Sequence, residues 1–432
     1  MHSLKIKSGL KGSPIIPGDK SISHRSIIIP SISNGVTEVK NYLNSDDVIN
    51  TLNAFSLMGV KITKERKKLI IHGKGLSSLK QPKKNIYLGN SGTSARLLTG
   101  LLAGQQFKST LTGDKSLSVR PMGRIVKPLK KMNSHITTNN NLLPLEIDGK
   151  ELIGTTIDIK IPSAQIKSGV ILAALNATGK THIIENNITR NHTEIMLESF
   201  DADISIKNEN EKKIITIAGK KELKSKNIDV PSDLSSSAFF IVAALINDNS
   251  HIILENININ PTRNGILIAL KKMGAKISIF NKKISNNEEV CDIEVISSNL
   301  NGCELDAQIA KLMIDEYPVL SIAASFANSP SVFKGLAELR VKESDRLNLI
   351  LINLRRCGVN TEIKGDDLYI YPSKNYDVKN NNIRTDYDHR IAMAFAIMGS
   401  KIGPLNINES DSIKTSFPTF IYEFNKIGGL IS

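Results

Sequence analysis

The sequence contains no tryptophan, only 5% aromatic residues and three cysteines in 432 positions. So few aromatic rings leave little material for stacking on nucleic-acid bases. Cys291, Cys303 and Cys357 form no Cys-x-x-Cys pair and are odd in number, which argues against a zinc site or a disulfide framework. We therefore expect a reducing, cytoplasmic environment.

Several common binding segments are also missing. The Gly-Asp-Lys-Ser sequences at 18–21 and 113–116 do not complete a phosphate loop, and no Gly-x-Gly-x-x-Gly follows a strand. The eight histidines show no metal-ligand spacing. No apolar run is long enough to cross a bilayer, and the first residues lack the apolar core of a signal peptide. We predict no nucleotide, flavin or metal cofactor, and no membrane partner.

The charge is strongly positive, with a net value of +14 and a pI of about 9.4. Such a balance is typical of nucleic-acid-binding proteins. Here, however, the lysines are scattered rather than gathered into one tract, and lysine, asparagine and isoleucine are abundant together. We expect a mild field that attracts small anions and no nucleic-acid partner. A basic, repeat-built nucleic-acid binder without catalysis is the alternative from a different class.

One local pattern, a polar helix-starting cluster that runs into small and apolar residues, occurs six times. Successive copies are 70, 72, 69, 83 and 73 residues apart when they are anchored at Ser21, Ser91, Ser163, Ser232, Asp315 and Asp388. A period near seventy predicts one supersecondary module copied six times. Each copy begins with a helix, here called an anchor helix.

A second helix is expected between the anchors, at 46–58, 120–132, 193–200, 262–273, 343–357 and 418–427. Each is followed by a residue type that tolerates the left-handed conformation which closes a helix, namely Gly59, Asn133, Asp201, Gly274, Gly358 and Gly428. Runs such as 69–71 and 156–161 are expected to be strands. Each module should therefore run strand, helix, strand, helix, strand, strand.

These modules predict an α/β fold of two similar domains, each with three βαβαββ-type units and buried helices. A single core stops growing at roughly 250–300 residues, so this chain should divide in two. Pro and Gly punctuate the chain at Pro17-Gly18 and near Pro231. We expect one domain at 18–231 and another at 232–432 together with 1–17, whose first strand, Leu4–Leu10, is assigned to the C-terminal half. One elongated solenoid is the alternative, which the largely apolar anchor helices disfavour.

Basic residues recur where the helices begin. A helix N-terminus offers free N–H groups and a partial positive charge to an anion. A single arginine there is usually structural, so the recurrence carries the argument. If related helices point at a common cleft, the cations converge and repel one another until an anion joins them. The cleft should then be open when empty and close around its ligand. The cations are Lys20, Arg25, Arg96, Arg120, Arg124, Lys167, Arg190, Arg340, Lys342, Arg346 and Arg390.

Four residues are candidates for proton transfer. Asp315 starts an anchor helix and Glu343 lies beside Lys342; taken alone, each is better explained as a helix N-terminal carboxylate. In a closed cationic cleft, either could exchange protons with a substrate hydroxyl or carbon. Lys20 is a third candidate, because neighbouring cations favour loss of its proton. His389 is a fourth, with an equal case for a structural role.

Eight blocks, in order from one end of the chain to the other, resemble the EPSP synthase family of the shikimate pathway, the 3-phosphoshikimate 1-carboxyvinyltransferases. They lie at 17–25, 88–93, 120–124, 163–168, 314–318, 340–346, 388–393 and 415–418. The resemblance implies two similar domains of three units each, closing on a central cleft, with the N-terminal strand in the C-terminal domain. It also implies transfer of the enolpyruvyl group of phosphoenolpyruvate to the 5-hydroxyl of shikimate 3-phosphate, with release of phosphate, in aromatic amino-acid biosynthesis.

The resemblance also assigns residues to each substrate. Shikimate 3-phosphate is implied to contact Lys20, Ser21, Arg25, Ser163, Ala164, Gln165, Arg190, Asp315 and Lys342. Phosphoenolpyruvate is implied to contact Lys20, Asn90, Gly92, Arg120, Gln165, Arg346 and Arg390. Asp315 would accept the hydroxyl proton, and Glu343, with Lys20, would protonate the enol carbon. His389 stays open as another donor. We expect a monomer.

The chain departs from the family pattern at two positions. Many members have serine where Ala164 stands, and many have lysine where Thr415 stands, with Lys414 one place earlier here. Whether Lys414 replaces that lysine stays open. Sensitivity to glyphosate also stays open: the family associates it with glycine at position 92, whereas the block 120–124 and Ala164 resemble the more tolerant members. The sister enzymes that transfer enolpyruvate to a UDP-amino sugar are the nearest rivals. They usually carry a cysteine in the loop that corresponds to 115–120, and this chain has none there.

Overall fold

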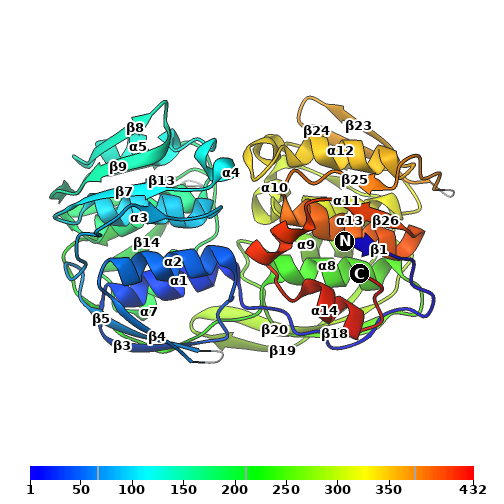
Figure 1. Ribbon diagram of the computed structural model, residues 1–432, viewed down its shortest axis with the longest axis horizontal. Coiled ribbons are helices and arrows are strands. Elements are labelled where there is room, and N and C mark those ends of the chain that lie inside the picture. The colour runs from blue at the N-terminus through cyan, green and yellow to red at the C-terminus, as the bar shows by residue number, and fades with distance from the viewer. Residues whose placement is uncertain (66–67, 210–211, 374–375) are drawn as a thin grey trace. The chain divides into compact units, whose positions relative to one another are not determined.

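The computed structural model describes residues 1–432 apart from 66–67, 210–211 and 374–375. The described residues divide into two compact units (Figure 1). We call residues 18–230 with 285–288 the N-terminal unit, and residues 1–17, 231–284 and 289–432 the C-terminal unit. Each unit has its own hydrophobic core. The predicted mixed α/β fold is confirmed.

The second module shows the repeated architecture completely. Its strands form one sheet in the order β6-β7-β9-β8. β6 and β7 are parallel, whereas β9 is antiparallel to both β7 and β8. The parallel pair needs a crossover, and a helix supplies it. In chain order the elements are β6 (Ile86–Tyr87), α3 (Gly92–Ala103), β7 (Lys108–Thr112), α4 (Lys115–Ser118), α5 (Gly123–Lys130), β8 (His135–Asn139) and β9 (Leu142–Asp148).

The third and fifth modules have the same topology, with sheet orders β11-β13-β15-β14 and β21-β22-β24-β23. The third contains β11 (Thr156–Ile159), α6 (Ala164–Ala174), β13 (Lys180–Glu185), α7 (His192–Ser199), β14 (Ile204–Glu209) and β15 (Lys212–Ala218). The fifth contains β21 (Glu304–Leu305), α10 (Ala307–Met313), α11 (Tyr317–Ser325), β22 (Ser331–Phe333), the 3-10 helix η1 (Ala337–Val341), α12 (Arg346–Arg356), β23 (Asn360–Lys364) and β24 (Asp367–Tyr371). A short parallel pair, β10 (Leu152–Ile153) and β12 (Ala177–Thr178), lies beside the third module.

The first and fourth modules take their first strand from a distant part of the chain. In the first, β17 (Ile228–Asp229) and β16 (Leu223–Lys224) pair in parallel with β3. In the fourth, β2 (Lys11–Gly12) pairs in parallel with β18. The first module continues as α1 (Lys20–Ser31), β3 (Ser33–Lys40), α2 (Asp46–Leu57), β4 (Lys61–Glu65) and β5 (Lys68–Lys74). The fourth continues as α8 (Leu234–Ile246), β18 (His251–Asn258), α9 (Gly265–Lys272), β19 (Lys276–Ser285) and β20 (Glu288–Ile296).

The sixth module is completed by the first residues of the chain. β1 (His2–Ser3) is antiparallel to β26, and Ser3 also forms a bridge with Ile431. The predicted strand Leu4–Leu10 is wrong: this segment is irregular, because Gly9 has a φ of +76° and Ile6 N donates to the carbonyl of Ser400 instead of a strand. The module consists of β25 (Asn382–Ile383), α13 (His389–Ile402), β26 (Leu405–Ile407), the 3-10 helix η2 (Ser410–Thr415) and α14 (Phe420–Lys426).

The six stop residues of the second helices have the predicted conformation. All have a positive φ, namely Gly59, Asn133, Asp201, Gly274, Gly358 and Gly428. In the first five modules this left-handed turn redirects the chain from the helix into the third strand. The second helices were predicted at the right places, although four of them begin two or three residues later than expected.

The anchor helices form the interior of each unit (Figure 1). Every residue of α8 is buried. α3 and α6 approach so closely that a Cβ on Gly100 would lie 1.8 Å from the carbonyl oxygen of Gly169. In the C-terminal unit the ring of Phe240 lies 5.7, 5.8 and 6.0 Å from those of Phe417, Phe420 and Phe424. Both contacts require small or planar side chains at fixed positions along the helices.

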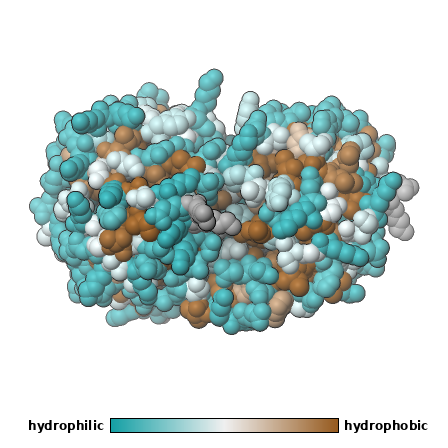
Figure 2. Space-filling view, turned by 60° about the horizontal axis from the view of Figure 1, so that its bottom comes forward, coloured by the Kyte–Doolittle hydropathy of each residue, from teal (hydrophilic) through white to brown (hydrophobic). Residues whose placement is uncertain are grey.

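Hydrophilic residues cover most of the face shown in Figure 2, with hydrophobic patches between them. Exposed large apolar side chains such as Val119 and Tyr387 are scattered along the chain, which is usual for folded proteins. Among the residues that the structure describes, no helix is both long and apolar enough to cross a membrane. The three cysteines are free and buried.

Candidate functional site

Five of the six anchor helices begin with a side chain that caps their free N–H groups. Asp19, Ser91, Ser163, Asp233 and Asp388 cap α1, α3, α6, α8 and α13. In α8 the cap is Asp233, one residue after the expected anchor Ser232. Capping fixes the direction of each helix start and therefore of the polar side chains beside it.

The expected cap Asp315 is an exception, and that interpretation is wrong. The chain breaks between α10 and α11 at 314–316, and α11 begins after Glu316 without a side-chain cap. Asp315 instead lies in the break, and its Oδ1 accepts a hydrogen bond from Nη1 of Arg346 at 3.1 Å. The carboxylate therefore belongs to an ion cluster and not to the helix end.

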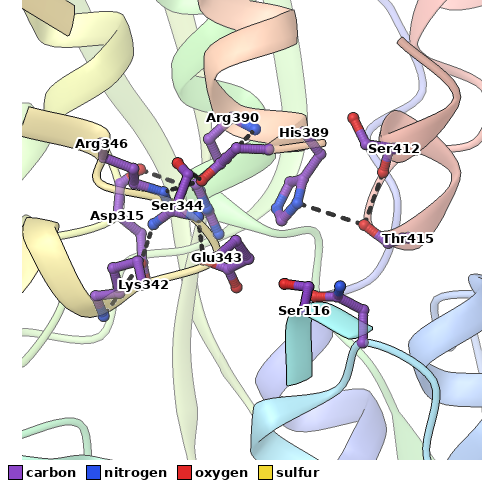
Figure 3. Close-up of polar contacts among 12 residues, drawn as sticks. Ser116, Asp315, Lys342, Glu343, Ser344, Arg346, His389, Arg390, Ser412 and Thr415 are labelled. Atoms are coloured by element: carbon purple, nitrogen blue, oxygen red, sulfur yellow. Dashed lines mark hydrogen bonds and ion pairs between the residues drawn. The ribbon is translucent and has the colours of Figure 1, made fainter. Parts of the chain in front are cut away.

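Arg346, at the start of α12, is the centre of this cluster (Figure 3). Each of its three nitrogens pairs with a different carboxylate: Nε with Asp388 at 2.8 Å, Nη1 with Asp315 at 3.1 Å and Nη2 with Glu343 at 2.5 Å. The side chain of Arg346 is 0% exposed, whereas that of Glu343 is 22% exposed. Glu343 is thus the most accessible of the three carboxylates.

The carboxylates stabilise the charged form of Arg346. Burial by itself lowers the pKa of Arg346, but Asp388, Glu343 and Asp315 reverse that effect, and the net shift is upward. Two further cations belong to the group: Lys342, whose Nζ lies 3.5 Å from Asp315, and Arg390. Three carboxylates thus balance three cations, so the expected self-repulsion does not arise in this cluster.

Arg390 and His389 start α13 beside the cluster. Nη1 of Arg390 donates to the backbone carbonyl of Asp315 at 3.3 Å, so it holds the same turn that carries the carboxylate. His389 points towards Thr415, with Nδ1 3.4 Å from its hydroxyl (Figure 3). Lys414 pairs with Asp411 at 2.6 Å, and its side chain is 65% exposed. The threonine, not the lysine, therefore lies next to His389.

In the N-terminal unit, Lys20 and Arg25 lie on α1. Nζ of Lys20 pairs with Asp47, at the start of α2. Arg25 is buried; it donates to Oγ1 of Thr193 at 2.6 Å and to Oγ of Ser168 at 2.7 Å. Burial is the main reason that the pKa of Arg25 falls to about 10, and it still leaves the side chain charged at neutral pH. Two hydroxyls thus aim this guanidinium.

A second cationic group surrounds the start of α3. Arg120 donates to the backbone carbonyl and the side-chain oxygen of Asn90, and Arg96 donates to Oε1 of Gln165 at 2.8 Å. A Cβ on Gly92 would lie 2.7 Å from Nη1 of Arg96 and 3.2 Å from Nη1 of Arg120. The absence of a side chain at Gly92 therefore makes room for both guanidinium groups at the helix N-terminus.

Two further predicted cations pair with other carboxylates. Lys167 is 0% exposed and pairs with Glu185 and Glu194 in the interior. Arg340 pairs with Asp366 and Asp345 near the surface. Lys167 is two residues after Gln165 in the same helix, so the two side chains leave it on different faces.

The sequence did not single out several partners of the predicted residues. These are Asp47, Ser168, Thr193, Ser344 and Asp388, the last as an ion-pair partner of Arg346. Asp47 follows another aspartate at a predicted helix start, which is the one local signal for it. The remaining candidates, Ser21, Ser163, Ala164 and Arg190, lie at helix starts or in the loop before one and are partly exposed.

No group of three or more His, Cys, Asp or Glu side chains with metal-binding arrangement occurs among the described residues. Arginine, lysine and free helix N-termini bind anions, and paired carboxylates among them provide proton acceptors. The repeated modules and these polar groups are typical of an enzyme that handles small anionic substrates.

Comparison with known proteins gives the family. The model of the EPSP synthase (3-phosphoshikimate 1-carboxyvinyltransferase) family matches residues 4–424. A 3-phosphoshikimate 1-carboxyvinyltransferase from Ruthia magnifica is 44% identical over 98% of this chain and 97% of that protein. One from Oenococcus oeni is 42% identical over 98% of each chain. The structure of EPSP synthase from Acinetobacter baumannii superposes with a TM-score of 0.86, at 40% identity, over 99% of this chain and 98% of that one. The chain belongs to the EPSP synthase family of enolpyruvyl transferases.

Proposed function

We propose that the protein transfers the enolpyruvyl group of phosphoenolpyruvate to the 5-hydroxyl of shikimate 3-phosphate and releases phosphate, in aromatic amino-acid biosynthesis. The family match supports the reaction. The single observation of geometry that best supports it is the position of Asp315 and Glu343 on one guanidinium, with Lys342 and Arg390 beside them. Such a cluster combines anion binding with proton acceptors in a few ångströms.

Shikimate 3-phosphate would be bound by residues that offer hydroxyl, amide and cationic donors at helix starts. Arg25, already aimed by Ser168 and Thr193, would contact an anionic group of the substrate. The proposed set is Lys20, Ser21, Arg25, Ser163, Ala164, Gln165, Arg190, Asp315 and Lys342. Ala164 contributes a backbone N–H at most, because it lacks the hydroxyl that many family members have.

Phosphoenolpyruvate would be bound by Lys20, Asn90, Gly92, Arg120, Gln165, Arg346 and Arg390. Arg346 is enclosed by three carboxylates, so an incoming anion must displace one of them to reach it. Glu343 is the most exposed of the three, and we propose that it is the one displaced. A carboxylate that loses its cation binds a proton more readily, so substrate binding would prepare Glu343 as an acid.

The chemistry then needs one base and one acid. Asp315 accepts the proton of the 5-hydroxyl while the oxygen of that hydroxyl bonds to C2 of phosphoenolpyruvate. Protonated Glu343 gives its proton to C3. The product is a tetrahedral ketal. Glu343, now ionised, takes a proton back from C3 while phosphate leaves C2 with the proton held by Asp315, and the double bond is restored. Lys20 and His389 stay alternative donors to C3, and cations around the leaving phosphate stabilise its charge.

The test is phosphate release with purified protein, phosphoenolpyruvate and either shikimate 3-phosphate or a UDP-amino sugar. Release with shikimate 3-phosphate alone supports the proposal. Release with the UDP-amino sugar alone identifies the sister reaction. No release with either, together with salt-sensitive binding to DNA, favours the nucleic-acid binder.

The role of Asp315 is tested by Asp315→Asn. We expect turnover to fall by at least about 100-fold, as for loss of a general base, with little change in the dissociation constants of both substrates. Asp345→Asn is the matched control, since Asp345 caps α12 in the adjacent turn and asparagine caps equally well. Full turnover in Asp315→Asn would remove the residue from its role. A monomeric state, a cytoplasmic location and closure of the units on a shared cleft stay predictions.

A further inference from the structure

Lys167 makes three polar contacts with the segment 185–194. Its ammonium group donates hydrogen bonds to Glu185 Oε2 at 3.0 Å and to the carbonyl of Thr189 at 3.2 Å, and it forms an ion pair with Glu194 Oε1 at 2.8 Å. Glu185 ends β13, Glu194 lies in the first turn of α7, and Thr189 lies in the loop between them. One side chain from α6 therefore holds both ends and the middle of this loop.

The loop carries Arg190, the residue immediately after Thr189. A second bond, from the Thr189 hydroxyl to Glu185 Oε1 at 2.6 Å, fixes the same residue from its side chain. Arg190 lies close enough to Arg25 for its charge to lower the pKa of Arg25, along with the larger effect of burial. The loop thus holds the guanidinium of Arg190 near that of Arg25, although the two positive charges repel each other.

Stability is weak grounds for a lysine at this position. Lys167, Glu185 and Glu194 are 0%, 1% and 1% exposed, and ion groups buried to this degree are often replaced by apolar residues without loss of stability. Burial by itself raises the pKa of Glu194, but Lys167 and Lys213 reverse this, and the net pKa is lowered. The carboxylate of Glu194 therefore stays charged and remains paired with Lys167.

We propose that Lys167 is a positioning residue for shikimate 3-phosphate: it fixes the loop 186–191 so that Arg190 points its guanidinium at the anionic substrate next to Arg25. This inference depends on the proposed function, because it takes Arg190 as a contact of that substrate. Lys167 itself touches no ligand.

The experiment is a double-mutant cycle between Lys167→Met and Arg190→Ala, followed by steady-state kinetics with each substrate varied. We expect Lys167→Met to raise KM for shikimate 3-phosphate about tenfold, a size usual for coupling within one ionic network, with KM for phosphoenolpyruvate unchanged. In the Arg190→Ala background, Lys167→Met should add no further increase. Glu185→Gln, which keeps the shape of the side chain and weakens both loop contacts, is measured in parallel and should raise the same KM. It replaces Lys167→Met in the test if that variant does not fold.

Thr181→Val is the control, a buried substitution on the same strand that leaves the loop contacts intact. It should not change either KM. If Arg190→Ala raises KM but the folded Lys167→Met and Glu185→Gln variants do not, the positioning role is wrong while the function stands. An equal increase from Lys167→Met with and without Arg190 also overturns it. If Arg190→Ala has no effect, the assignment of Arg190 under the proposed function fails first.

Discussion

Replacing Gly92 by alanine should separate the stability of α3 from the anion site at its N-terminus. The new Cβ would lie 2.7 Å from Nη1 of Arg96 and 3.2 Å from Nη1 of Arg120, whereas ordinary contact begins at 3.4 Å. Arg96 must therefore move by 0.7 Å (3.4 − 2.7) and Arg120 by 0.2 Å (3.4 − 3.2). Arg96 is hydrogen-bonded to Gln165 and Arg120 to Asn90, two residues proposed to contact phosphoenolpyruvate, so both would shift with the arginines.

Misplacement by 1 Å costs on the order of 100-fold in reactions that depend on orientation. For the smaller shift here we expect kcat/KM for phosphoenolpyruvate to fall by about tenfold. The helix should not suffer, since alanine exceeds glycine in helix propensity by up to about 1 kcal/mol and Gly92 does not need a positive φ.

The assay measures phosphate release at varied phosphoenolpyruvate and saturating shikimate 3-phosphate, and thermal unfolding reports stability. A lower kcat/KM with an equal or higher Tm is the expected pair of results. Unchanged kinetics in a folded variant would show that Arg96 and Arg120 do not shape the phosphoenolpyruvate site.

Two further predictions concern the interior. Gly100→Ala should lower the free energy of unfolding by about 1–3 kcal/mol, as overpacking does, because the Cβ meets the Gly169 carbonyl oxygen at 1.8 Å. Urea unfolding measures this free energy, and Gly92→Ala is the matched control. A Gly100→Ala variant as stable as the unchanged protein would contradict the close packing of α3 and α6. Burial raises the pKa of Cys291 and Cys357 to about 12 and of Cys303 to about 11, against a usual value of 9.0. The native thiols should therefore not react with a thiol reagent at pH 8 until urea unfolds the chain, and rapid labelling of the folded protein would refute this burial of the thiols. The free energy of unfolding should fall between pH 9 and 12, where the unfolded state loses these protons and the native state keeps them.

The module and its period could be predicted because they depend on local rules. A left-handed stop after each second helix needs a particular residue type, and glycine, asparagine or aspartate stands at each of these positions. The exchanged strands could not be predicted in the same way. β2 and β17 have two residues each, too few for a periodic pattern, and their partners are far away in the sequence.

The site was predictable as a set of cations but not as a set of contacts. Recurrence at helix starts found Arg120, Arg346 and Arg390. It could not show that Lys167 leaves α6 on the inner face, because its glutamate partners lie 18 and 27 residues further along the chain. The break that takes Asp315 out of a helix has a local signal in Pro318, in the first turn of α11, but the partners of Asp315 could not be predicted, since they lie on two later helices.

The way β1 closes the sixth module has a consequence for biosynthesis. His2 N donates to the carbonyl of Ser432 at 2.7 Å, and Ser432 N donates back to His2 at 3.0 Å. Contacts between such distant residues form slowly, because a long loop must close first. The N-terminal unit needs little beyond Asp229 to complete its first sheet, whereas the sixth module needs both β1 and the distant β26. During translation β1 therefore has to wait for its partner β26, and the C-terminal unit completes its last sheet after the N-terminal unit has completed its first.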